Sequence, residues 1–214
     1  RTHALRTVVQ AGADNTVEVH IAMSTPRLRE DLITYKIYPN GRLYVYHSAV
    51  PKQDMLRFGF QMTLPGSYEY VNWYGRGPHP SYRDRKTGAA LGRYQSTVTA
   101  LEHRYMRPQE SSNRTDTYDL YLCDSHGEGF RVQAYYETPF AFSAYHYTTM
   151  GLDKAAHIHE IPYDPSLTTL NIDGPQCGVG GDLPGQGAVR APYRVTAGEK
   201  CSYAFILEPM HKKK

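Results

Sequence analysis

The sequence predicts an all-β protein built as one large antiparallel sandwich, and three observations support this fold class. Apolar residues alternate with polar neighbours in many short runs along the chain. The segments between these runs are rich in Gly and Pro, as in the loops of antiparallel sheets. No segment carries the sustained 3.6-residue apolar repeat that a parallel α/β fold requires. A single domain spanning residues 1–214 is expected, because sandwiches of this length need not divide.

The first strands are predicted over residues 17–23, 33–37 and 43–45, where every second side chain is apolar. Pro39-Asn40-Gly41 separates the second run from the third. An Asn-Gly pair between two alternating runs is the strongest short-range signal for a β-hairpin. The sequence therefore predicts a hairpin with its turn at Asn40 and Gly41.

Later strands are predicted over residues 118–122, 130–136, 140–144 and 203–207, each with one buried face. Breakers rich in Gly and Pro separate them, at residues 65–66, 75–80, 125–129 and 178–187. Gly75 and Gly77, followed by Pro78, indicate a chain reversal. Only residues 150–160 have a helical pattern, so at most one short helix is expected.

The composition narrows the classes of function. The 19 Tyr residues suit pleated, half-buried surfaces and polar, ring-shaped ligands. The net charge is only +3 and the basic residues are scattered, which argues against nucleic-acid binding. No apolar run approaches the roughly 18 residues of a membrane span. Three widely spaced cysteines do not predict a disulfide framework, and the first residue, Arg1, indicates a piece of a longer or processed polypeptide.

Four segments carry distinctive strings of residues: 57–65 (RFGFQMTLP), 71–85 (VNWYGRGPHPSYRDR), 107–116 (RPQESSNRTD) and 170–182 (LNIDGPQCGVGGD). In this order and spacing they resemble the C-terminal, last domain of the family-two β-galactosidases, with the best match over residues 55–209. The resemblance implies the large supersandwich fold shared with galactose mutarotases. It also implies a parent enzyme that hydrolyses terminal β-D-galactosides.

In that family the two catalytic carboxylates lie in a (β/α)₈ barrel, for which this chain has neither the helices nor the length. No catalytic residue is therefore expected here. The expected partners are the barrel and other domains of the parent polypeptide, with a galactoside at the domain edge. The resemblance allows a homo-oligomeric parent in the bacterial cytoplasm or periplasm. It allows Mg²⁺ and Na⁺ in the full-length enzyme, and implies no cofactor for this chain.

The family places a Trp that contacts sugar in the loop after the Gly-Gly-Asp string. Here that string ends at Asp182, and the Trp position falls at or near Gly185, beside Gln186. An aromatic ring offers the sugar an apolar face, whereas Gly offers none. Asp182, Gly185 and Gln186 are therefore predicted as a substrate-edge loop that is either built differently or no longer contacts sugar.

A second candidate site is a polar cluster, interpreted either as a network that organises loops or as a surface facing the active-site cleft. Buried charges in such a cluster must be paired. Arg83, Asp84 and Arg85 are expected to form an ion-pair cluster. Trp73 is more typical of a core than of a sugar platform. The cluster comprises Trp73, Arg83, Asp84, Arg85, Arg107, Glu110, Asn113 and Arg114.

Two other functions remain open from the sequence. The many Tyr residues also suit a non-catalytic carbohydrate-binding module. A mutarotase-like aldose epimerase needs an acid and a base across the sugar ring. His146 with Glu110, or His159 with Asp173, is a candidate pair. His157, His159 and Glu160 lack a further ligand at zinc-like spacing, so no metal site is predicted.

Overall fold

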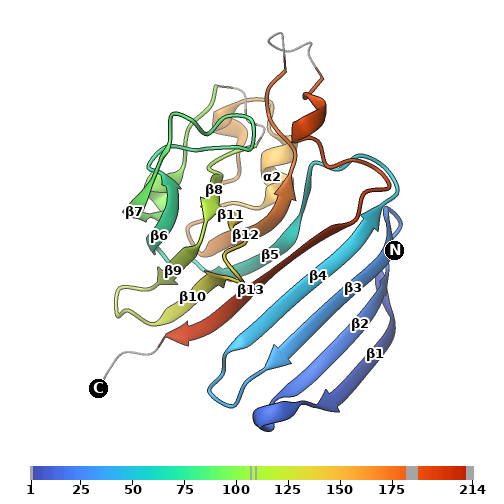
Figure 1. Cartoon of the computed structure of the whole chain (residues 1–214). Coiled ribbons are helices and arrows are strands. Elements are labelled where there is room, and N and C mark those ends of the chain that lie inside the picture. The colour runs from blue at the N-terminus through green and yellow to red at the C-terminus, as the bar shows by residue number, and fades with distance from the viewer. Residues whose placement is uncertain (1, 107, 109, 182–187, 211–214) are drawn as a thin grey trace.

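The computed structural model describes residues 2–106, 108, 110–181 and 188–210, and it consists of two antiparallel sheets of unequal size (Figure 1). The larger sheet has nine strands in the order β1-β2-β3-β4-β13-β10-β9-β6-β7. The smaller has four, in the order β5-β12-β11-β8. The predicted all-β sandwich is confirmed. Within the described residues no helix is long and apolar enough to cross a membrane.

The first four strands form a meander in the larger sheet: β1 (His3–Ala11), β2 (Val17–Ser24), β3 (Leu28–Ile37) and β4 (Leu43–Pro51). The predicted Asn-Gly turn joins β3 to β4. Gly41 there has a φ of +83°, in the left-handed region that glycine adopts without strain. The turn is closed by the amide of Tyr38, which donates to the carbonyl of Arg42.

The remaining strands are distributed between the two sheets, so the chain repeatedly crosses from one layer to the other. The smaller sheet takes β5 (Arg57–Pro65), β8 (Arg114–Thr117), β11 (Phe140–Tyr145) and β12 (Leu167–Gln176). The larger takes β6 (Tyr70–Gly77), β7 (Ala90–Thr97), β9 (Asp119–Cys123), β10 (Gly129–Ala134) and β13 (Cys201–Met210).

The helical segments are short. The pattern at residues 150–160 corresponds to α2 (Thr149–Lys154) and the 3-10 turn η2 (Ile158–Glu160). A second helix, α1 (Val98–Leu101), was not expected; its four residues are too few to show a repeat, and the side chain of Thr97 caps it by accepting from the amide of Ala100. Two further 3-10 turns are η1 (Ala13–Asn15) and η3 (Ala191–Tyr193).

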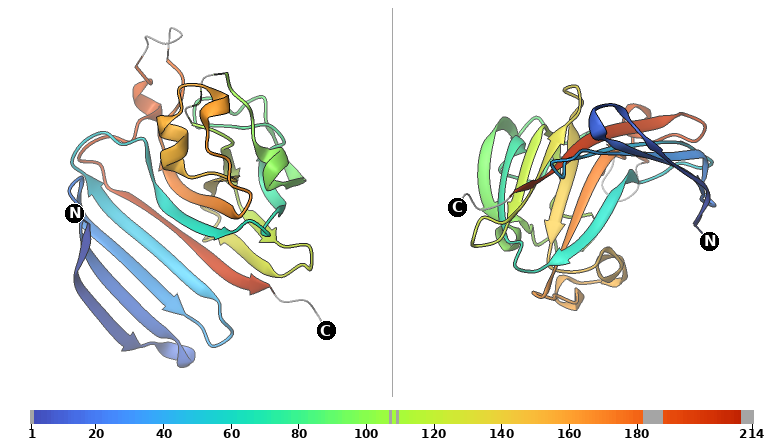
Figure 2. Two further views of the ribbon diagram at one scale, coloured as in Figure 1. Left: turned by 180° about the vertical axis from the view of Figure 1, so that it is seen from behind. Right: turned by 90° about the horizontal axis from the view of Figure 1, so that it is seen from below.

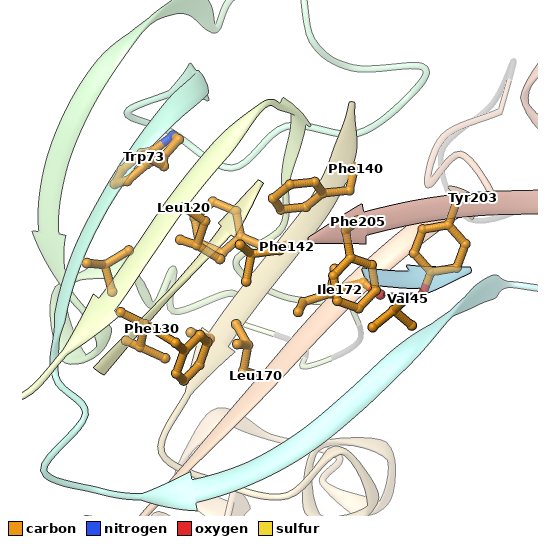
Figure 3. Packing of buried hydrophobic residues seen from close by; sticks show 14 of the residues in the cluster. Val45, Trp73, Leu120, Phe130, Phe140, Phe142, Leu170, Ile172, Tyr203 and Phe205 are labelled. Atoms are coloured by element: carbon orange, nitrogen blue, oxygen red, sulfur yellow. Dashed lines mark hydrogen bonds between the residues drawn. The ribbon is translucent and has the colours of Figure 1, made fainter. Parts of the chain in front are cut away.

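The main core lies between the two sheets, where side chains from β6, β9 and β13 meet those of β11 and β12 (Figure 3). The prediction that each strand has one buried face is wrong for β11, because all six of its residues are buried. Its second face is covered by a smaller cluster beside α2, formed by Tyr145, Tyr147 and Leu152 with Ile161 packed against them.

Gly75 and Gly77 do not form the predicted chain reversal, because both lie inside β6. Their role is close packing. A Cβ atom on Gly75 would lie 2.8 Å from Oγ1 of Thr117, and one on Gly77 would lie 2.9 Å from the ring of Trp73. The absence of side chains at these positions lets β8 and the Trp73 ring approach the β6 backbone.

Candidate functional site

A cavity of about 650 Å³ opens at the end of the smaller sheet where β5 begins. Its wall combines charged and small residues from four parts of the chain, including Arg57, Glu110, Thr149, Lys154, Gly178 and Val179. Gly178 and Val179 lie shortly before the predicted substrate-edge loop. Asp182, Gly185 and Gln186 themselves lie outside the described residues.

Two charged residues of this wall, Arg57 and Glu110, form a cluster with the buried Asp173 behind them, and we call the three the Arg57 triad. Nη2 of Arg57 lies 3.1 Å from each carboxylate oxygen of Glu110 and 3.2 Å from Oδ2 of Asp173. Asp173 is only 2% exposed. One guanidinium thus pairs with two carboxylates, which leaves the triad with a net charge of about −1 when both acids are ionised.

The pairing of β5 with β12 creates the triad. Gly59 of β5 lies directly opposite Asp173 of β12. A Cβ atom on Gly59 would lie 2.0 Å from Oδ1 of Asp173, so only glycine leaves room for that carboxylate. The register of the two strands shifts between Asp173 and Gln176, where Gln176 pairs with Arg57. The local irregularity brings the guanidinium to the carboxylate.

Burial governs the pKa values of the triad. It raises the pKa of Asp173 to about 6, with Arg57 lowering it and Glu110 raising it further. Burial also raises the pKa of Glu110, and Arg57 offsets this only in part. For Arg57, burial alone would lower the pKa, but the charges of Asp173 and Glu110 raise it. The triad is therefore a site where a proton is taken up below neutral pH.

Arg114 and Trp73 belong to the packing between β6 and β8. Arg114 is buried and donates to the carbonyl oxygens of Leu101, Ser112 and Pro78 at 2.6–3.1 Å. Burial lowers its pKa to about 10. Its guanidinium lies 5.8 Å from the centre of the Trp73 ring, whose other contacts are Tyr94 and Phe142. Trp73 is a core residue, not a sugar platform.

The predicted ion-pair cluster of Arg83, Asp84 and Arg85 is wrong. Asp84 accepts from the amides of Val179 and Gly180 at 3.2 and 2.8 Å. Arg83 donates to carbonyl oxygens beside η3, those of Pro192 and Arg194. Arg85 pairs with Tyr82 through its backbone. Backbone amides and carbonyls of residues 179–180 and 192–194 thus bind these side chains in place of mutual ion pairs, because the fold brings those segments next to residues 83–85.

Asn113 also organises a loop, since its side-chain amide donates to the carbonyl of Ser81 at 2.8 Å. Of the predicted polar cluster, therefore, Glu110 lines the cavity, while Trp73, Arg83, Asp84, Asn113 and Arg114 hold strands and loops together. Arg107 lies outside the described residues. The structure adds Arg57, which stood in one of the distinctive strings but had no signal of its own beyond its charge. It also gives Asp173, expected only as a possible partner of His159, a different partner in Arg57.

The members of both candidate acid–base pairs for an epimerase are engaged by other residues. Nε2 of His146 lies 2.6 Å from Glu69, and its Nδ1 lies 2.8 Å from the carbonyl of Leu167, so His146 is not paired with Glu110. Asp173 pairs with Arg57, while His159 stacks on His157.

His157, His159 and Glu160 do place one ligand atom each within 4.8 Å of one another. The carboxylate of Glu160, however, already accepts from the amides of Ala156 and His157 and lies 3.0 Å from Nδ1 of His157. This arrangement is a capping box for η2, which accounts for the cluster without a ligand.

Comparison with known proteins assigns the family. The profile of the family described as β-galactosidase small chain matches residues 2–207. A β-galactosidase of Priestia megaterium is 29% identical over 97% of this chain and 20% of its own length. One of Halalkalibacterium halodurans is 33% identical over 81% and 18%, and one of Vibrio cholerae is 36% identical over 69% and 14%. The chain thus spans about a fifth or less of these relatives, and it belongs to the β-galactosidase small-chain family.

Proposed function

We propose that this chain is a supporting domain of a β-galactosidase, which holds one wall of the substrate site while another part of the polypeptide supplies the catalytic carboxylates. The observation that carries the proposal is the family match over residues 2–207, together with relatives about five times as long. The supported function is hydrolysis of terminal β-D-galactosides by the longer polypeptide.

The geometry of the Arg57 triad fits a supporting role. A retaining glycosidase needs one carboxylate free to attack the sugar and a second free to protonate the leaving group. Both oxygens of Glu110 are held by Arg57, and Asp173 is too deeply buried to meet a substrate. The cavity and residues 179–181 beside it are accessible, so substrate contact in this chain would come from these parts.

The test is hydrolysis of a chromogenic β-galactoside by the longer polypeptide, by its Glu110→Gln variant and by this chain alone. We expect Glu110→Gln to retain activity within about tenfold, because its charge is not part of the chemistry. Removing a catalytic group typically costs at least about 10³–10⁴-fold in kcat. A loss of that size, or turnover by this chain alone, would place catalysis here and reject the proposal.

A carbohydrate-binding module is the second candidate, and the cavity is the observation that favours it. Its volume of about 650 Å³ lies in the range of small-molecule sites, and its wall carries charged and hydroxyl groups. Calorimetric titration of this chain with galactose and lactose separates the candidates. Millimolar or tighter binding that is lost in Lys154→Ala supports a module, whereas no heat of binding supports the scaffold.

A further inference from the structure

The nine-stranded sheet extends well beyond the four-stranded sheet on the side of β5. In Figures 1 and 2, β1, β2 and β3 continue outward past β5 with no second layer against them. β5 is the edge of the smaller sheet on that side, and within the part of the chain that the structure describes it pairs only with β12. One long edge of backbone hydrogen-bonding groups is therefore left open beside an uncovered sheet.

The uncovered face is a continuation of the core. Residues that pair directly across neighbouring antiparallel strands lie on the same face of a sheet. Val45, Tyr35, Val19 and Val9 form such a row across β4, β3, β2 and β1. Val45 is 3% exposed, Tyr35 and Val19 are half-buried, and Val9 is 64% exposed. Burial is thus high at β4, intermediate at β3 and β2 and low at β1, while the side chains remain apolar.

We call this surface the inner face of β1–β3. Nine uncharged residues from three paired rows form most of it: Thr7, Val9, Ala11, Val17, Val19, Ile21, Ile33, Tyr35 and Ile37. The next row pairs Met23 with Asp31 and so adds a carboxylate, which is buried and lies 2.8 Å from Nε2 of His47. The outer face of the same strands is more polar, with Lys36 3.7 Å from Glu18 and His20 3.1 Å from Thr34 among apolar residues such as Leu32. The two faces differ as the buried and solvent faces of an antiparallel sheet differ.

The core-facing side chains of β5 are also incompletely covered. Phe58 is buried, whereas Phe60, Met62 and Leu64 pack against the core yet remain half-exposed. Half-exposed apolar residues on the inner side of an edge strand lack a neighbour on the next strand. An added strand beside β5 would cover these residues and the inner face of β1–β3 together, and it would satisfy the open backbone edge.

We propose that one or more β-strands from the rest of the parent polypeptide pair with the free edge of β5 and continue the smaller sheet over the inner face of β1–β3. The inference rests on the proposed function, in that it requires the chain to be part of a longer β-galactosidase polypeptide. About four fifths of the length of such relatives lies outside the region matched by this chain. The occupant has alternating apolar and polar residues, since one side faces an apolar surface.

Hydrogen exchange tests the backbone part of the proposal. We expect the amides of β5 that do not donate to β12 to exchange at least about tenfold slower in the longer polypeptide than in the 214-residue chain. The same comparison should show slower exchange in β2 and β3. Equal exchange of the β5 amides in both proteins overturns the inference.

A matched pair of variants tests the side-chain part, in the longer polypeptide. Ile37 and Leu32 both lie on β3 and are 43% and 46% exposed here, but Ile37 is on the inner face and Leu32 on the outer. Ile37→Asp should lower the midpoint of thermal unfolding by several degrees and abolish the protection of β5. Leu32→Asp should change neither. Equal effects of the two substitutions contradict the proposal.

The outcomes also distinguish failure of this inference from failure of the proposed function. Galactosidase activity of the longer polypeptide without protection of β5 agrees with the proposed function and rejects the added strand. Protection of β5 without galactosidase activity supports the added strand and rejects the enzymatic function. Sedimentation of the 214-residue chain supplies a third outcome: a concentration-dependent dimer that Ile37→Asp dissociates and Leu32→Asp does not would identify a second copy as the occupant, against the proposal.

Discussion

Two regions of the nine-stranded sheet, its centre and its β1 side, bury the same sequence pattern to different extents. Around β9, β10 and β13 the alternating side chains meet a second sheet, and residues such as Leu120, Val132 and Phe205 are buried. In β2 the same alternation gives Val17, Val19 and Ile21, which remain half-buried or exposed. The two regions have the same alternating pattern, but only the first has a second sheet packed against it.

Alternation of apolar and polar residues therefore predicts which face of a strand is apolar. It does not predict whether the chain contains a second sheet that packs against that face. Burying a full Val or Ile side chain stabilises a fold by about 1.5–3 kcal/mol. The two-layer region gains this contribution within the 214 residues. The one-layer region, β1 to β3, gains only part of this stabilisation. The remainder would be gained if another element packed against its inner face.

The largest expected effect is on a matched pair of isoleucines. Ile172 on β12 is fully buried between the layers, and Ile21 on β2 is half-buried on the inner face. Ile172→Ala should lower the free energy of unfolding of this chain by about 4 kcal/mol, because it leaves a cavity. Ile21→Ala should cost about 1 kcal/mol or less. Denaturant unfolding measures both values, and equal losses would contradict the distinction between the two regions.

The same pair sharpens the comparison in the longer polypeptide. If added strands cover the inner face there, the loss caused by Ile21→Ala should rise toward that of Ile172→Ala. A loss that stays below about 1 kcal/mol in both proteins would show that β1 to β3 remain a single layer.

Much of the fold was predictable from the sequence, because its signals are local. The strands at 17–23, 33–37 and 203–207, the Asn40-Gly41 turn and the near-absence of helix all follow from alternation and turn chemistry. The unequal sheets did not follow from local pattern. Which strand lies opposite which depends on pairings such as β13 between β4 and β10, and residue types do not encode these distant neighbours.

The candidate site was only partly predictable, because some of its signals are local and others depend on strand pairing. The dense polar string at 107–116 identified Glu110, but its partners come from β5 and β12. Arg57 and Asp173 become a site only through the strand register that places Gly59 opposite Asp173. The expected ion pairs of Arg83, Asp84 and Arg85 failed because backbone amides and carbonyls compete for these side chains, and backbone partners leave no signature in the sequence.

The second prediction compares a buried charge cluster with an exposed one. Arg57→Met removes the only cation of the triad and leaves the buried carboxylate of Asp173 and the half-buried one of Glu110 without a counter-charge. Leaving a buried charge unpaired typically costs about 3 kcal/mol or more. The loss should be smaller at pH 5 than at pH 8, because protonation then neutralises the acids. Lys36→Met removes the cation beside Glu18 on the solvent face of β3 and should have a much smaller effect, since water screens that pair.

Chemical denaturation of both variants at the two pH values checks this prediction. An Arg57→Met loss no greater than that of Lys36→Met would show that the triad is open to solvent. A loss that does not depend on pH would show that the two carboxylates are not the source of the cost.

The smallest expected effect is on the pH dependence of stability. The pKa of Asp173 is about 6 in the folded chain and 3.8 for an ordinary aspartate, so the folded state binds its proton more tightly. This contribution is fully present below pH 4 and is lost as the pH rises through 6. Asp173→Asn should therefore remove a decrease of about 2 kcal/mol in the free energy of unfolding between pH 4 and pH 8.

Glu18→Gln is the control for this prediction, because that carboxylate lies on the outer face of β2 and its pKa is lowered by its hydrogen bond with Gln10. This lowering moves the pKa of Glu18 away from the range in which Asp173 titrates, so the variant should keep the wild-type slope from pH 5 to pH 8. Urea unfolding across this range gives the slopes. A wild-type slope in Asp173→Asn would place the proton elsewhere in the triad, on Glu110, whose pKa is also raised by burial and which alone of the two acids reaches the cavity.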